Sequence, residues 1–109
     1  MINVTLFRKD NKIMGFELSG HANSGPYGYD LVCAGVSAVT FGAVNAILML
    51  SELDLDIEQA DDGGYLHVTL PDYVEAEAME KAQLLLEGLL ISLQTIEREY
   101  SQFINIQEK

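Results

Sequence analysis

The feature that most constrains the fold is a stretch of twenty residues without a charged side chain, Leu31–Leu50. Its length equals that of a helix that crosses a lipid bilayer. However, Asp30 and Glu52 flank it in place of the lysine and arginine that anchor membrane helices, and polar residues such as Ser37 and Asn45 lie within it. We therefore predict a helix buried in a protein core, and no membrane partner.

A helix with apolar side chains on nearly every side needs partners on every side. The sequence has 109 residues, which we interpret as a single domain spanning residues 1–109. Such a domain offers a sheet for one side of the helix and a second helix for another. That second helix also carries surplus apolar residues at Leu84, Leu90 and Ile91. We expect a homodimer to cover the remaining apolar surface.

Alternation of apolar and polar residues predicts two β-hairpins. In the first, residues 2–6 and 14–18 alternate on either side of the polar connection RKDNK. In the second, residues 55–58 and 66–70 flank the sequence DDGG, whose glycines accept the positive φ of a tight turn. The polar positions of this second hairpin are rich in carboxylates, which protect a strand from pairing edge to edge with other chains.

A second helix is predicted after Pro71, because Asp72 with Glu75 three positions later resembles a capping box. The residues that share one face of this helix are Ala82, Leu85, Leu86, Leu89, Leu93 and Ile96. The tail SQFINIQ favours a short last strand. The predicted fold is α+β: a small sheet of two hairpins plus a last strand, covered by two helices, in the order β-β-α-β-β-α-β.

Charge and cysteine content exclude several classes of function. The 17 acidic residues against 6 basic ones give a net charge of -11, which opposes direct binding of nucleic acid. A single cysteine allows neither an intramolecular disulfide nor a multi-cysteine zinc site, so we expect no metal and no other cofactor. At the N-terminus the charges follow the apolar residues, the reverse of a secretion signal. We expect a cytoplasmic protein.

The candidate site lies in residues 20–35, GHANSGPYGYDLVCAG. Asp30 stands where a helix N-cap belongs, which places Cys33 in the first helical turn, where unpaired amides and the helix dipole favour a thiolate. His21 is the nearest group in sequence that can take up the thiol proton. We predict that Cys33 is a nucleophile and His21 its acid/base partner, although a lone cysteine in an apolar helix is also typical of a small core residue.

Two neighbouring residues have alternative roles. Asp30 can cap the helix by accepting amide hydrogen bonds, or it can orient the imidazole of His21 as a third catalytic member. Ser37 follows Cys33 by one helical turn, so its hydroxyl can point to the same site or bond to the helix backbone.

The loop between the strand and the helix contains glycines at Gly20, Gly25 and Gly28. Because glycine permits backbone swings, we predict hinges at these positions and a mobile loop over residues 20–30 that closes on substrate. Tyr27 and Tyr29 are candidates for lining a groove for a peptide, or for anchoring the loop.

The motifs GHA at residues 20–22 and YG-x-DLVCAGVSAV at residues 27–39 resemble the ribosomal-processing cysteine proteases (Prp) of Firmicutes and related bacteria. The resemblance implies an α+β homodimer without a metal that acts as a cysteine endopeptidase. It implies Cys33 as nucleophile and His21 as base. The implied substrate and partner is the precursor of the bacterial large-subunit ribosomal protein numbered twenty-seven, whose N-terminal extension is removed in support of ribosome assembly.

Two other classes of function fit the same residues. A non-catalytic ribosome-assembly factor would bind a basic protein through the acidic surface, and Cys33 would then be dispensable. A thiol redox sensor would use a reactive cysteine but has no resolving cysteine in the chain.

Overall fold

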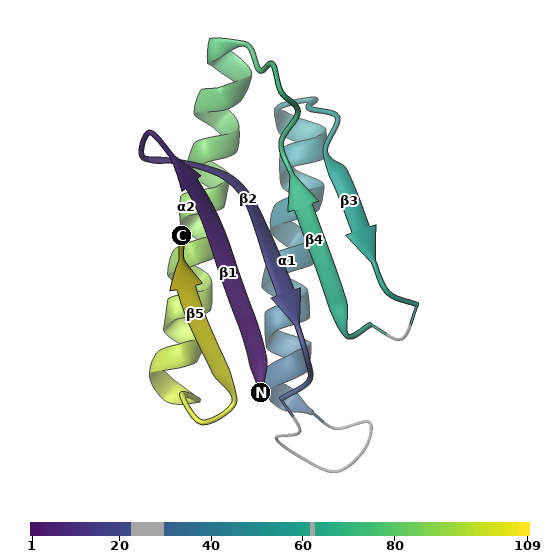
Figure 1. The fold of residues 1–109 in the computed structure, drawn as a ribbon, viewed down its shortest axis with the longest axis vertical. Coiled ribbons are helices and arrows are strands. Elements are labelled where there is room, and N and C mark those ends of the chain that lie inside the picture. The colour runs from purple at the N-terminus through teal and green to yellow at the C-terminus, as the bar shows by residue number, and fades with distance from the viewer. Residues whose placement is uncertain (23–29, 62) are drawn as a thin grey trace.

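A computed structural model describes residues 1–22, 30–61 and 63–109 of the chain. Its elements are β1 (Ile2–Lys9), β2 (Lys12–Ser19), α1 (Leu31–Leu50), β3 (Asp56–Gln59), β4 (Tyr65–Thr69), α2 (Ala76–Glu99) and β5 (Ile104–Glu108). The strands form one sheet in the order β3-β4-β2-β1-β5, and the two helices cover one of its faces (Figure 1). The predicted α+β class and order of elements are confirmed.

The first hairpin turns tightly at Asp10 and Asn11, which both have positive φ angles of 54° and 67°. A register shift between Phe7 and Arg8 changes which side chains of β2 point inward. As a result Ile13 is fully buried, whereas Met14, which the alternation placed in the core, is only half-buried. The last strand, β5, lies at one edge of the sheet and pairs with β1 in parallel.

Helix α1 runs along the inner face of the sheet. It is long and apolar enough to cross a membrane by length and composition, yet 28% of its most apolar segment is buried in the structure. Val32, Val36, Val44 and Ile47 pack into the core. Residues such as Met49 remain exposed, so the expectation of burial on nearly every side is not met within one chain. The sheet and α2 cover one side, and the other faces outward.

Helix α2 begins later than predicted. Its N-cap is Glu75, which makes no side-chain capping hydrogen bond, so the expected capping box of Asp72 and Glu75 is wrong. Residues 70–75 cross from β4 to the start of α2 (Figure 1), and the backbone of Glu75 is still extended, with φ -63° and ψ 151°, so the helix begins only at Ala76. Leu90, which we counted as surplus, is buried in the core, whereas Leu84 and Ile91 are exposed as expected.

An ion-pair network joins three elements at the opposite end of the sheet from the N-terminus of β1. Arg8 on β1 donates from Nε to Glu108 on β5 at 2.7 Å. It also donates to both carboxylate oxygens of Glu87 on α2, at 2.8 and 2.9 Å. This fork geometry fixes the relative position of the helix and the sheet edge.

Candidate active site

Cys33 lies in the first turn of α1, as the sequence predicts. Asp30 caps the helix: its Oδ1 accepts a hydrogen bond from the amide of Cys33 at 3.1 Å. The carbonyl of the same Asp30 accepts from the amide of Ala34 at 3.0 Å. Both amides are therefore engaged in starting the helix, and the Cys33 side chain is half-buried beside them.

Another backbone amide, that of Ala22, points at the sulfur of Cys33. The N–H of Ala22 donates to Sγ of Cys33 at 3.2 Å. A hydrogen bond to sulfur favours the thiolate over the thiol, because the negative charge is the stronger acceptor. Ala22 is buried and directly follows His21, so the contact joins the segment of the histidine to the helix of the cysteine.

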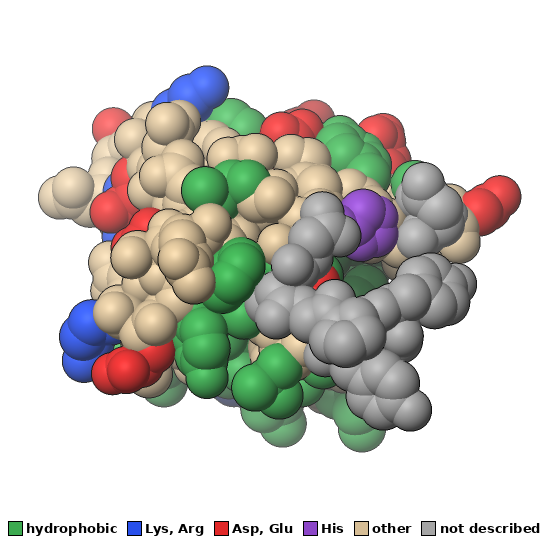
Figure 2. Space-filling view, turned by 90° about the horizontal axis from the view of Figure 1, so that it is seen from below, with side chains coloured by type: hydrophobic (Ala, Val, Ile, Leu, Met, Phe, Trp, Pro, Cys, Tyr) green, Lys and Arg blue, Asp and Glu red, His purple; other side chains and the backbone are tan. Residues whose placement is uncertain are grey.

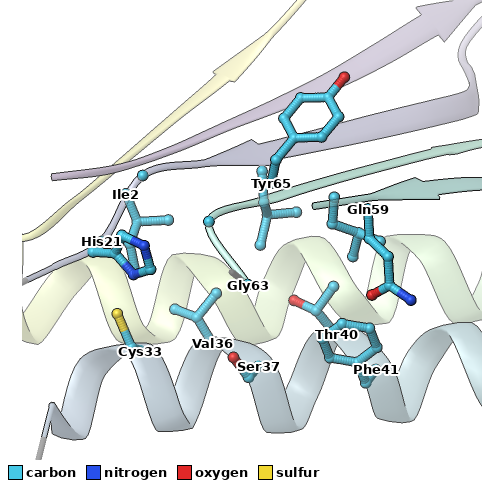
Figure 3. Close-up of a pocket in the computed structure, with 14 residues that line it drawn as sticks. Ile2, His21, Cys33, Val36, Ser37, Thr40, Phe41, Gln59, Gly63 and Tyr65 are labelled. Atoms are coloured by element: carbon cyan, nitrogen blue, oxygen red, sulfur yellow. The ribbon is translucent and has the colours of Figure 1, made fainter. Parts of the chain in front are cut away.

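The backbone of His21 is held by the residue that precedes β1. Its carbonyl oxygen accepts a hydrogen bond from the nitrogen of Met1 at 2.7 Å. The imidazole is exposed, and the Cys33 sulfur points toward it from the helix below (Figure 3). The structure thus brings the predicted nucleophile and the predicted base to one place.

The backbone conformation of Gly20 sets the direction in which the chain leaves β2 and enters His21. Its φ is +92°, and a Cβ at this position would lie 2.3 Å from the carbonyl oxygen of Met1. Its amide donates to the carbonyl of Gly64 in the second hairpin at 2.9 Å. The close approach and the positive φ are sufficient to require a glycine at this position. The role of Gly20 as a hinge stays a prediction.

Cys33 and His21 open into a cavity of about 170 Å³ between α1 and the sheet. Figure 3 shows its floor and walls, formed by the side of α1 that follows Cys33 and by the ends of β2 and β4. The residues that line it include Ile2, Leu18, Val36, Ser37, Thr40, Phe41, Gln59, Gly63, Tyr65 and Leu66. The cavity is mostly apolar, and it extends away from the sulfur along the helix.

The remaining predicted site residues fall into two groups. Ser37 lines the cavity and is exposed. Its hydroxyl makes no hydrogen bond with the described residues, so neither of its two predicted roles is decided. Gly25, Tyr27, Gly28 and Tyr29 lie outside the described residues, as does most of the loop over residues 20–30.

Sequence reasoning missed the contribution of the second hairpin. Gln59, Gly63 and Tyr65 reach the cavity because β4 pairs with β2 and lies at the end of the sheet where α1 begins. The burial of Tyr65 and its hydrogen bond to Glu17 raise the pKa of the phenol. The other histidine, His67, contacts Phe7 edge-on at 6.1 Å and does not line the cavity.

The arrangement suits nucleophilic chemistry on an acyl group. It combines a sulfur that accepts an amide hydrogen bond, an imidazole beside it, and an apolar cavity for part of a substrate. Within the described residues, no three His, Cys, Asp or Glu side chains are grouped closely enough to hold a metal ion.

Comparison with known proteins agrees with this chemistry. The model of the family described as cysteine protease Prp matches residues 1–105. The ribosomal processing cysteine protease Prp of Bacillus subtilis (strain 168) is 47% identical over 107 residues, which cover 97% of this chain and 96% of that protein. Two crystal structures of the essential ribosomal processing protease Prp from S. aureus cover 100% of both chains. The complex with a covalently linked product peptide matches at a TM-score of 0.91 and 44% identity, and the complex with a substrate peptide at 0.84 and 43%.

Proposed function

The chain belongs to the family of the cysteine protease Prp, and we propose from this that it is an endopeptidase in which Cys33 and His21 form a catalytic dyad. The observation that carries the dyad is the position of the two groups. Cys33 begins a helix, its sulfur accepts the Ala22 amide at 3.2 Å, and it points toward the His21 imidazole (Figure 3).

In the first step the Cys33 thiolate attacks the carbonyl carbon of the scissile peptide bond, and His21 carries the proton that the thiol has given up. The tetrahedral intermediate collapses when the bond to nitrogen breaks. His21 donates its proton to the leaving amine, and the acyl group remains on sulfur as a thioester. The covalently linked product peptide in the S. aureus relative supports a covalent route.

In the second step a water molecule attacks the thioester carbonyl while His21 accepts its proton. The bond to sulfur breaks, the acid product leaves, and the Cys33–His21 pair is restored. No redox partner and no metal ion enters this sequence. The Ala22 amide, which donates to Sγ at 3.2 Å, stabilises negative charge on the sulfur both in the attacking thiolate and in the departing one.

The substrate we propose is the precursor of the large-subunit ribosomal protein numbered twenty-seven, from which the enzyme removes an N-terminal extension in the cytoplasm. The names of the relatives support a ribosomal substrate. The net charge of -11 supports a basic protein partner rather than nucleic acid.

The test is incubation of the purified precursor with the wild type, Cys33→Ala and His21→Ala, followed by intact mass of the products. We expect cleavage by the wild type at one bond and loss of cleavage in both variants, with binding of the precursor retained by Cys33→Ala. Equal processing by Cys33→Ala would refute the proposal and leave a non-catalytic binding factor.

We also propose that the chain forms a homodimer through the outward sides of its helices. Exposed apolar residues there include Leu48 and Met49 on α1 and Leu84 and Ile91 on α2. Figure 2 shows hydrophobic side chains gathered in the lower middle of this face, with acidic and basic side chains to their left. Burial of such a patch is the main driving force for association.

A further inference from the structure

Thr40 is a fully buried polar residue in the middle of α1. It lies on the side of the helix that faces the sheet, and it lines the cavity that begins at Cys33. Its Oγ1 has no hydrogen-bond partner among the described residues. In Figure 3 the Thr40 side chain rises from the helix between Val36 and Phe41, with its oxygen on the side of the cavity where Cys33 lies.

A buried hydroxyl without a partner destabilises a folded protein, so an unpaired one needs an explanation. A threonine inside a helix ordinarily bonds to the carbonyl four residues earlier. Thr95 on α2 does so, donating to the carbonyl of Ile91 at 2.8 Å. Thr40 does not, and its hydroxyl therefore keeps its hydrogen-bonding capacity for a group that enters the cavity.

Among the described residues, no other buried side chain of the cavity can make this interaction, and Gln59, which also lines it, is exposed. The inner walls of the cavity are the apolar side chains of Ile2, Leu18, Val36 and Leu66, all of them buried. Ser37 is exposed, and the Tyr65 hydroxyl donates to Glu17 at 3.1 Å. The cavity volume of about 170 Å³ suits one large side chain, since an apolar cavity of about 150 Å³ holds a benzene molecule.

The position of Thr40 also sets which substrate residue reaches it. Thr40 follows Cys33 by seven residues, so the two lie on the same side of the helix and about 10 Å apart along its axis. An extended peptide advances about 3.3 Å per residue. A side chain that fills the cavity therefore belongs to a residue about three positions from the scissile bond.

We propose that Thr40 is a specificity-determining residue. The cavity receives a substrate side chain with an apolar body and a hydroxyl tip, as in tyrosine or threonine, and the tip bonds to Oγ1 of Thr40. This inference rests on the proposed peptidase function and adds to it a residue that determines which substrate sequence is cleaved.

The test uses pairs of synthetic peptides from the N-terminal extension of the precursor. Each pair differs only by a hydroxyl, Tyr against Phe or Thr against Val, at one of the four positions on either side of the scissile bond. At one position we expect the wild type to prefer the hydroxyl by about fivefold in kcat/KM, the effect of one neutral hydrogen bond. Thr40→Val should bring this ratio to about one, and Thr40→Ser should restore it.

Thr95→Val is the matched control, because it removes a hydroxyl from a helix far along the chain whose partner is its own backbone. It should leave the ratio at the wild-type value. A second readout is the melting temperature without peptide. Thr40→Val should leave it unchanged or raise it, because an unpaired buried hydroxyl is removed without loss of volume.

The outcomes separate this inference from the proposed function. Cleavage with a ratio near one at every position, or a preference that survives Thr40→Val, overturns the role of Thr40 and leaves the peptidase intact. Absence of cleavage overturns the peptidase, and the same peptide pairs are then compared by calorimetric titration. A hydroxyl preference in Kd that Thr40→Val abolishes supports the site, whereas equal Kd values or no binding overturn it.

Discussion

The amide of Ala22 donates a hydrogen bond to the sulfur of Cys33, although the two residues are eleven positions apart and lie on opposite sides of the loop. The contact means that the segment after β2 and the first turn of α1 meet in the described structure. His21 is covalently bound to Ala22, so whatever positions this amide also positions the backbone of His21. In the proposed enzyme, the reactivity of the cysteine would therefore depend on the backbone geometry after β2.

We expect Cys33 to react with iodoacetamide in the folded protein. The side chain is half-buried beside an exposed imidazole, and thiolates rather than thiols are the reactive form. Mass spectrometry should detect one added group, and the alkylated protein should no longer cleave the precursor. A cysteine that stays unmodified even with bound leader peptide would contradict the assignment.

Gly20→Ala should disturb the site through the backbone. The new Cβ would lie 2.3 Å from the Met1 carbonyl oxygen, at a φ of +92° that costs a side chain about 1 to 3 kcal/mol. We expect a lower melting temperature and at least a tenfold loss of kcat/KM. Gly88→Ala is the control, because a Cβ there meets nothing within 4 Å and should stabilise α2 by about 1 kcal/mol. Equal activity of the two variants would argue against the close approach at Gly20.

Variants of Asp30 distinguish capping from orientation of the histidine. Asparagine keeps an oxygen for the Cys33 amide, whereas alanine does not. We expect Asp30→Ala to lose about 0.5 to 2 kcal/mol of unfolding free energy and Asp30→Asn to lose little. Denaturant unfolding and cleavage assays together give the answer. If Asp30→Asn folds as stably as the wild type yet is inactive, the carboxylate charge acts on His21.

Stability should fall in acid because of Glu87. The hydrogen bonds from Arg8 hold the pKa of this carboxyl below its ordinary value of 4.5. A depressed pKa contributes stability above the unfolded value, and this contribution is lost as the pH falls through the folded value. Urea unfolding at pH 6 and pH 3 should therefore show a smaller pH dependence for Glu87→Gln than for the wild type. Glu77→Gln, at an exposed site paired only with Lys81 at 3.6 Å, should behave like the wild type.

The proposed dimer is tested by charges on the exposed side of α2. Ile91→Glu should shift the mass measured by sedimentation equilibrium from dimer toward monomer, because Ile91 is 63% exposed in the single chain and a buried carboxylate opposes association. Gln102→Glu adds the same charge at an exposed position beyond the end of α2 and should retain the dimer. A wild type that sediments as a monomer at every concentration would rule the dimer out.

The sequence by itself determined the elements and singled out Cys33 and His21 as the candidate pair. Alternation placed the hairpins, the uncharged stretch placed α1, and Asp30 three residues before Cys33 placed the sulfur in the first helical turn, because these signals act over one to four residues. Failures occurred where a distant contact overrides a local signal. The bulge at Phe7 and Arg8 buries Ile13 fully, and the crossing from β4 delays the start of α2 beyond Asp72.

Only the tertiary structure decided what surrounds the sulfur. The pairing of β4 with β2 carries Gln59, Gly63 and Tyr65 to the cavity, and the pairing of β1 with β2 brings Met1 to His21. Strand order and register depend on how all the apolar faces fit together, which no short segment encodes. For the same reason the unpaired hydroxyl of Thr40 is visible only in the folded chain, where its burial and the absence of a partner among the described residues are seen together.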